Sequence, residues 1–228
     1  MSEMGCHIFN LCQRDFANGG EILLKMAKEH DIKFVASNTF YQDGDKHFTD
    51  PWQIVKVKPV KGKSSAVDEI TVGVVGFCDQ QNLLFARRLK EPLLYSKDPV
   101  AVAEKLVPDL RKKVDLVVML YHGSYKTVKS ILEKVKGIDV VIVGGQYYMI
   151  NEHENLNAVV ASTSSMGKYC GILTLTLDGN YKIVGQDKQS LQLDENVPDD
   201  PDMLKLLNEF DEAEAKAQDY RPEGNHGQ

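Results

Sequence analysis

The sequence has few cysteines, no excess of basic residues and no long apolar run. Its 228 residues include 4 cysteines and 1 tryptophan, and the formal net charge is −6. A negative net charge argues against a nucleic-acid groove, which usually needs a basic face. No apolar run approaches the length of a membrane span. The first residues lack the basic start and apolar core of a signal peptide, so we expect a cytoplasmic protein without a nucleic-acid or membrane partner.

The four cysteines, Cys6, Cys12, Cys78 and Cys170, lie far apart and form no C-x-x-C pair. This spacing favours reduced, partly buried thiols over a disulfide framework. Cys6 beside His7 resembles half of a zinc site, but no second pair at ligand spacing accompanies it. A redox or haem-linked module built on Cys6 and Cys12 is an alternative, and the lack of any C-x-x-C-H motif counts against it.

Buried strands and helices alternate through the middle of the chain. The apolar runs at 70–77, 114–122 and 138–143 are typical of strands that are covered on both faces. Asp98 and Pro99 predict a helix start, and the helix should run toward residue 113 with a bend or split at Pro108. A second helix is predicted at 124–135, with Ser124 as its cap.

A change of pattern follows these units. Residues 157–193 form apolar segments that short turns separate, and Asp178-Gly179-Asn180 is a strong hairpin signal. These segments predict antiparallel strands after the βαβ units, and therefore one layered α/β domain. We place the domain at residues 1–195 and an acidic C-terminal helix and tail at 196–228.

Three loops at the carboxyl ends of predicted strands are candidates for a site, because layered α/β folds place their ligands there. They contain Asn38, the stretch Tyr121-His122-Gly123, and the stretch Gly144-Gly145-Gln146. His122 ends an apolar strand, where a histidine can bind a metal, transfer a proton or simply bond a neighbouring loop. The helix start after it favours anions such as phosphate.

Three other motifs have simpler explanations. Asp45-Lys46-His47 resembles a metal-binding pair but lies in a polar loop, so we expect it to be solvated. The glycines of 72–76 lie within a strand, so they do not form a dinucleotide loop. The lysines at 56–63 predict an exposed edge strand that charge protects from pairing.

The order of these pieces resembles the N-terminal, metal-binding domain of the 5'-nucleotidase family of calcineurin-like metallophosphoesterases. MSEMGCHIFNLCQRDFANGGEILLKMAKE is similar to the family pattern MNxMGYDAxxxGNHEFDxGxxxLxxxxxx. FVASN, ITVGVVGF and LYHGS resemble (L/V)SAN, KVGVIGL and LSHxG, and IDVVIVGGQYY and SSMGKYCGILTLTLD resemble IDVIIGGHSH and xGxYxGxLxLxxD. The resemblance extends from Met1 to about Leu193. It implies a layered α/β sandwich of the metallophosphoesterase type, with two mixed sheets flanked by helices.

The family's chemistry implies phosphate ester hydrolysis by two metal ions, which clamp the phosphate and supply a metal-bound hydroxide. By resemblance, a ligand asparagine falls on Gln13 and the catalytic histidine beside it falls on Arg14. His122 is the only ligand retained. The two histidines of the GGHxH motif are replaced by Gln146 and Tyr148.

Two earlier motifs of the family, a strand ending in D-x-H and a strand ending in G-D, have no counterpart in the chain. We therefore expect the first strands of the fold to be absent. One histidine cannot provide the four to six donors of a divalent metal, and Arg14 adds a charge that opposes metal binding. An arginine can hold phosphate without a metal, so Arg14, Gly123, Gly144 and Gly145 define a candidate anion site.

These residues predict a degenerate 5'-nucleotidase-like domain with a binding or scaffolding role, no cofactor and no two-metal phosphoesterase activity. The alternative is a phosphoesterase or nucleotidase of nucleotide catabolism that uses a divalent metal such as Mn or Zn. Its N-terminal ligand motifs would then lie upstream of this chain or on a partner. Loss of the first strands would leave a sheet edge unpaired, so the expected partner is a second copy or a separately encoded N-terminal segment. The family is largely exported, whereas this chain shows no export signal.

Overall fold

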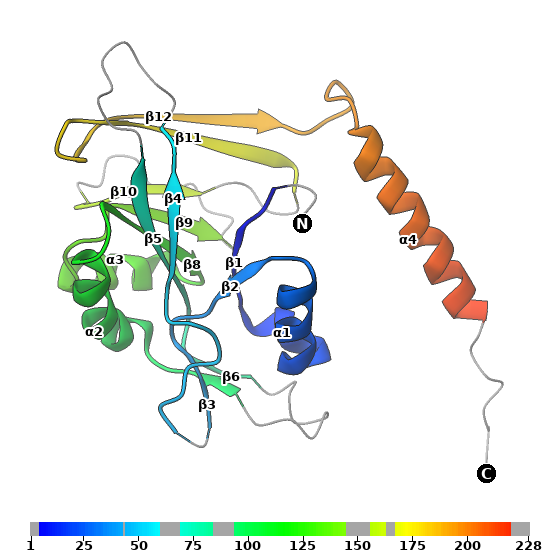
Figure 1. Ribbon diagram of the computed structural model, residues 1–228, viewed down its shortest axis with the longest axis horizontal. Helices are drawn as coiled ribbons and strands as arrows, with labels where there is room; N and C mark the ends of the chain where they lie inside the picture. The colour runs from blue at the N-terminus through cyan, green and yellow to red at the C-terminus, as the bar shows by residue number, and fades with distance from the viewer. Residues whose placement is uncertain are drawn as a thin grey trace. The chain divides into compact units, whose positions relative to one another are not determined.

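The computed structural model describes residues 5–42, 44–59, 69–83, 94–144, 156–162 and 167–219. The chain divides into two units, Met1–Gln192 and Leu193–Gln228. The first unit contains all the described strands, and the second contains the helix α4 (Pro201–Asp219) (Figure 1).

A five-stranded sheet lies at the centre of the first unit, in the order β10-β9-β8-β5-β4 (Figure 1). In that order its strands span Val159–Ser162, Val140–Gly144, Leu116–His122, Ile70–Cys78 and Gln53–Val57. Four of them are parallel, and β4 pairs antiparallel with β5. The sequence predicted β5, β8 and β9 correctly, because their apolar runs fit strands that are covered on both faces.

One prediction for this sheet is wrong. The strand β10 was expected among antiparallel strands, yet it pairs parallel with β9 from Val159↔Val140 to Ser162↔Val143. Parallel neighbouring strands need a connection of about a dozen or more residues, whereas two antiparallel strands can be joined by a turn of about two residues. Residues 145–158 separate the two strands in the chain, and this length permits the parallel return.

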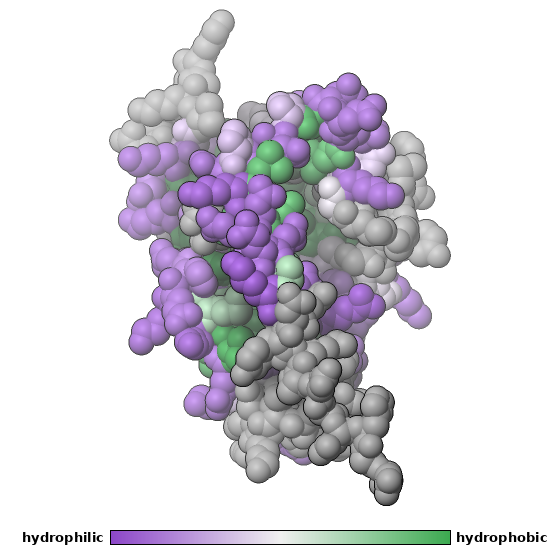
Figure 2. All heavy atoms as spheres, turned by 90° about the vertical axis from the view of Figure 1, so that its right-hand side faces the viewer, coloured by the Kyte–Doolittle hydropathy of each residue, from purple (hydrophilic) through white to green (hydrophobic). Residues whose placement is uncertain are grey.

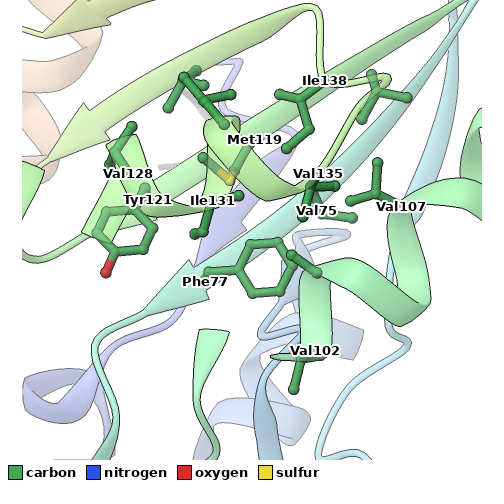
Figure 3. Close-up of a cluster of buried hydrophobic side chains, with 14 of the residues drawn as sticks. Val75, Phe77, Val102, Val107, Met119, Tyr121, Val128, Ile131, Val135 and Ile138 are labelled. Atoms are coloured by element: carbon green, nitrogen blue, oxygen red, sulfur yellow. The ribbon is translucent and has the colours of Figure 1, made fainter. Parts of the chain in front are cut away.

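The helices α2 (Pro99–Arg111) and α3 (Tyr125–Lys134) cover one face of this sheet (Figure 1). Figure 3 shows their apolar side chains meeting those of β5 and β8 in one buried cluster. It labels Val75, Phe77, Val102, Val107, Met119, Tyr121, Val128, Ile131, Val135 and Ile138. A fully buried side chain of this kind contributes about 1.5–3 kcal/mol, so this cluster dominates the stability of the unit.

The start of α2 is as predicted, and the helix is not split at Pro108. The Asp98 side chain accepts a hydrogen bond from Val100 N–H at 3.0 Å. Pro108 lies inside α2, which continues without a break to Arg111. Val107 and Leu110, near the proline, are fully buried in the core.

The other face of the sheet is covered in part by a smaller layer. The strand β1 (Ile8–Asn10) pairs parallel with β2 (Lys33–Val35), and α1 (Gly20–Glu29) lies between them in the chain (Figure 1). A side-chain carbon at Gly76 of β5 would lie 2.7 Å from Val35 Cγ1 and would also overlap the Asn10 side chain. The two layers therefore meet at a glycine, where the backbones approach closely.

The remaining strands form two small sheets. One has the order β3-β7-β6, from Thr39–Tyr41, Leu94–Ser96 and Gln81–Leu83. The other is the hairpin of β11 (Tyr169–Leu177) and β12 (Ile183–Gln192), with the predicted turn between them. The layered α/β class is thus confirmed, and among the described residues the strands outside the central sheet form three small sheets.

The helix α4 is acidic and carries exposed Leu204, Leu207 and Phe210. On the face of the molecule in Figure 2, hydrophobic residues lie between hydrophilic ones. None of the helices in the described ranges has the length and apolarity that a membrane span requires.

The close approach at Gly76 generates a stability prediction. Gly76→Ala should lower the free energy of unfolding by about 1–3 kcal/mol, because the added methyl group overpacks the contact with Val35 and Asn10. The control is Gly179→Ala in the β11–β12 turn, where a side-chain carbon would meet nothing within 4 Å. Urea unfolding should show a change of less than about 0.5 kcal/mol for the control. Equal losses in both variants would contradict the packing at Gly76.

Candidate functional site

The three strand-end loops that the sequence selects meet at one edge of the sheet. Cys78, the last residue of β5, lies opposite His122, which in turn lies opposite Gly144. Asn38 follows β2 and joins them, because its Nδ2 donates to Cys78 O at 2.8 Å and its Oδ1 accepts from Cys78 N–H at 3.1 Å. The described parts of these loops therefore lie at the carboxyl ends of neighbouring strands, where layered α/β folds place their ligands.

Asn38 serves as a structural link at this edge. It is fully buried, and its Nδ2 also donates to Lys97 O at 2.7 Å. The neighbouring Cys78 Sγ lies 3.2 Å from Ser96 Oγ. Buried polar groups need hydrogen-bond partners, and this network supplies them from within the chain. The Asn38 side chain is thus engaged in holding β2, β5 and β7 together.

His122 and Gly144 are both exposed at this edge. His122 ends β8, and its imidazole Nδ1 lies 3.9 Å from where a side-chain carbon would stand on Gly144. That distance is an ordinary contact, so Gly144 is not required by crowding at this point. The placement leaves the imidazole accessible to a ligand from solvent.

Asp79 occupies the space between β5 and α3, and the sequence motifs did not identify it. Its carboxylate accepts hydrogen bonds from Ser124 N–H at 2.9 Å, from Thr127 Oγ1 at 3.2 Å and from the Tyr121 hydroxyl. Gly123 has a φ of 147°, and a side-chain carbon there would lie 2.5 Å from the carboxylate carbon of Asp79. The sequence signal that could have identified Asp79 is its position directly after a buried strand.

The Tyr121 hydroxyl acts as a permanent donor to this carboxylate. Its ring belongs to the apolar cluster of Figure 3 and its oxygen points away from that cluster. Burial, followed by the hydrogen bond to Asp79, raises the pKa of Tyr121 well above its ordinary range. The phenol therefore stays protonated throughout the physiological pH range.

The residues at the first motif position lie in a short 3-10 helix, Gln13–Asn18. Arg14 is exposed and Gln13 is half-buried. Asp15, which the resemblance aligns with the motif's glutamate, accepts a hydrogen bond from Cys12 N–H at 2.7 Å. This carboxylate is thus engaged in a local cap.

The described residues do not fit a two-metal centre. Within the ranges that the structure describes, no three His, Cys, Asp or Glu side chains gather closely enough to hold a metal ion. A two-metal site clamps its substrate between ions that protein donors hold together, and the carboxylates Asp15 and Asp79 are hydrogen-bonded to backbone N–H groups instead. The predicted positions Gly145, Gln146 and Tyr148 lie outside the described residues.

The Asp45–His47 loop is only partly as expected. Asp45 is exposed and forms an ion pair with Lys97. His47, however, is half-buried, with its ring centroid 4.2 Å from that of Phe40, so the expectation of a solvated histidine is wrong. The reason is that the loop folds back onto β3, where Phe48 N–H bonds Thr39 O at 2.9 Å.

Comparison with known proteins confirms the resemblance. The chain is 26% identical to a 5'-nucleotidase of Diplobatis ommata over 62% of its length, and 23% identical to that of Bos taurus over 92%. These matches span 28% and 39% of the two relatives, so the chain covers less than half of either. No family model matches the sequence.

Solved structures support the fold. The calcineurin-like phosphoesterase YfkN from Bacillus subtilis superposes with a TM-score of 0.75 at 21% identity, over 96% of this chain and 73% of that one. A 5'-nucleotidase from Staphylococcus aureus has a TM-score of 0.66 at 18% identity, over 92% of this chain and 44% of that one. The layered α/β fold of the described chain is therefore that of calcineurin-like phosphoesterases.

The cysteines should differ sharply in reactivity. Cys170 is exposed on β11, whereas burial and the hydrogen bond to Asp15 raise the pKa of Cys12 to about 11. Since the thiolate is the reactive form, Cys170 should supply the fastest phase of labelling by Ellman's reagent at pH 8. Cys170→Ser should remove this phase and Cys12→Ser should leave it unchanged. If Cys12→Ser abolished the fast phase, the result would contradict this prediction and support a redox module built on Cys6 and Cys12.

His47 should make stability depend on pH. Burial, together with the charge of Lys97, lowers its pKa below the ordinary value of 6.5, so the unfolded chain binds the proton more readily. This contribution to stability is present above pH 6.5 and is lost as the pH falls through that value. In urea titrations between pH 7.5 and 5.5 at constant ionic strength, His47→Gln should lose less stability than the wild type. An equal or larger loss in the variant would contradict the assignment.

Proposed function

Since the chain resembles the N-terminal domain of 5'-nucleotidases and has the fold of calcineurin-like phosphoesterases, we propose that it is a degenerate member of this type. It binds a partner or serves as a scaffold and does not hydrolyse phosphate esters with two metal ions. The observation that supports the proposal is that the polar side chains near the strand ends form hydrogen bonds within the chain itself. Asp15, Asn38 and Asp79 all hydrogen-bond backbone groups of the chain itself.

These hydrogen bonds make metal binding by the same side chains less favourable. A metal at Asp15 or Asp79 would compete for these carboxylates with the backbone N–H groups that donate to them. The Tyr121 and Thr127 hydroxyls donate to the Asp79 carboxylate as well, and any buried donor that lost its acceptor would cost about 1–3 kcal/mol. Among the described residues of the three strand-end loops, His122 offers an exposed imidazole, and one imidazole is too few donors for a divalent cation.

The strand edges support a binding role. Among the described residues, β1 pairs only with β2 and β11 only with β12. A two-stranded hairpin is marginal by itself, and this one exposes Ile172 and Val184. An added strand would satisfy backbone groups at such an edge. A second copy of the chain or a separately encoded segment are the partners that this proposal names.

Hydrolysis of bis-nitrophenyl phosphate in the presence of Mn²⁺ tests the proposal. The purified chain should show no metal-stimulated turnover above that of buffer, and His122→Ala should not change the rate. His30→Ala is the matched control, because His30 is also exposed but lies at the end of α1. Manganese-dependent hydrolysis that His122→Ala abolishes and His30→Ala preserves would overturn the proposal. That result would support the alternative of a metal-dependent phosphoesterase, which the accessible position of His122 beside Gly144 favours.

A further inference from the structure

Asp79 connects three parts of the chain that meet beside His122. Its backbone N–H donates to His122 O at 3.3 Å, which joins the end of β5 to the end of β8. Its carboxylate accepts from Ser124 N–H and from the Thr127 hydroxyl, which belong to the first turn of α3 and its cap. The Tyr121 hydroxyl donates to the same carboxylate from the core side. One side chain thus holds both ends of the His122–Gly123 turn.

The first turn of a helix presents unpaired N–H groups and a partial positive charge, which together attract anions. At α3, Ser124 Oγ accepts from Lys126 N–H at 3.2 Å, and Asp79 accepts from Ser124 N–H. A negative charge of the chain therefore already stands at this helix start. The local cap at α2 differs, because Asp98 accepts from one N–H group two residues away.

The sequence makes room for this carboxylate. Any side chain at position 123 would collide with Asp79, and the φ of 147° at Gly123 is one that other residues rarely adopt. Tyr121 cannot withdraw its donor, because its ring is fixed in the buried cluster. Gly123 therefore leaves the space that the Asp79 carboxylate fills, and Asp79 supplies the acceptor for the Tyr121 hydroxyl.

We propose that Asp79 is a built-in substitute for an anion, which closes the start of α3 to phosphate and sets the His122 turn without any ligand. A phosphate approaching Ser124 N–H would meet the carboxylate that already uses this donor, and the two negative charges would repel each other. The candidate anion site at Gly123 is thus filled from within. The inference goes beyond the proposed function, since it does not depend on whether the chain hydrolyses a phosphate ester.

Hydrogen exchange followed by NMR on the full chain tests the role of Asp79. In Asp79→Ala the Ser124 amide should exchange at least about tenfold faster than in the wild type, because its acceptor is lost. The His122 imidazole resonances should shift or broaden in the same variant. The matched control is Asp98→Ala, which should speed exchange at Val100 and leave Ser124 and His122 unchanged. Unchanged exchange at Ser124 in Asp79→Ala would overturn the proposal.

Titration with inorganic phosphate tests whether the N-terminus of α3 can bind an anion. In the wild type, millimolar phosphate should not move the Ser124 amide resonance. In Asp79→Ala the resonance should move and its exchange should slow. If Asp79→Ala does not fold, Asp79→Asn removes the charge while keeping an acceptor, and its Ser124 resonance should respond to phosphate. A phosphate response at Ser124 in the wild type, or none in a folded variant, would contradict the closure.

Discussion

The parallel pairing of β5 with β8 is the constraint on which the strand-end loops depend. It sets Cys78 opposite His122, and the pairing of β8 with β9 then sets His122 opposite Gly144. One face of these strands is buried under α2 and α3, so a slip of one residue would turn the core side chains of a strand to the opposite face. The apolar cluster under α2 and α3 thus fixes the positions of polar residues that take no part in the core.

Most of the polar side chains described at this edge form hydrogen bonds with other groups of the same chain. Asn38 bonds two backbone carbonyls and one N–H group, Asp79 closes the start of α3, and Asp15 caps its own turn. A site that binds ligands must keep some of its donors and acceptors available. Here the accessible residues His122 and Arg14 lie beside side chains that already have partners within the chain.

Much of the fold was predictable because a strand that is buried on both faces has a continuous run of apolar residues. That rule identified β5, β8 and β9, and the Asp98 and Ser124 caps marked the helix starts. It missed β1, β3, β6 and β7, which are three residues long each and carry too little periodicity. It also assigned β10 the wrong direction, because direction depends on where a connection returns and not on the residues of the strand.

The sequence alone determined the residue types at the strand ends, including a histidine at the end of β8 and a double glycine that starts with the last residue of β9. It also determined the glutamine and arginine that stand where a metal site of this type would need other residues. It also determined the layered α/β class, since hydrophobic periodicity reflects local burial. Only the tertiary structure decided which of these residues are engaged. Asp79 looks like an unremarkable acidic residue until the register of β5 and β8 brings it to Tyr121, Ser124 and Thr127. Hydrogen bonds between residues more than forty positions apart follow from packing, and packing is a property of the folded chain.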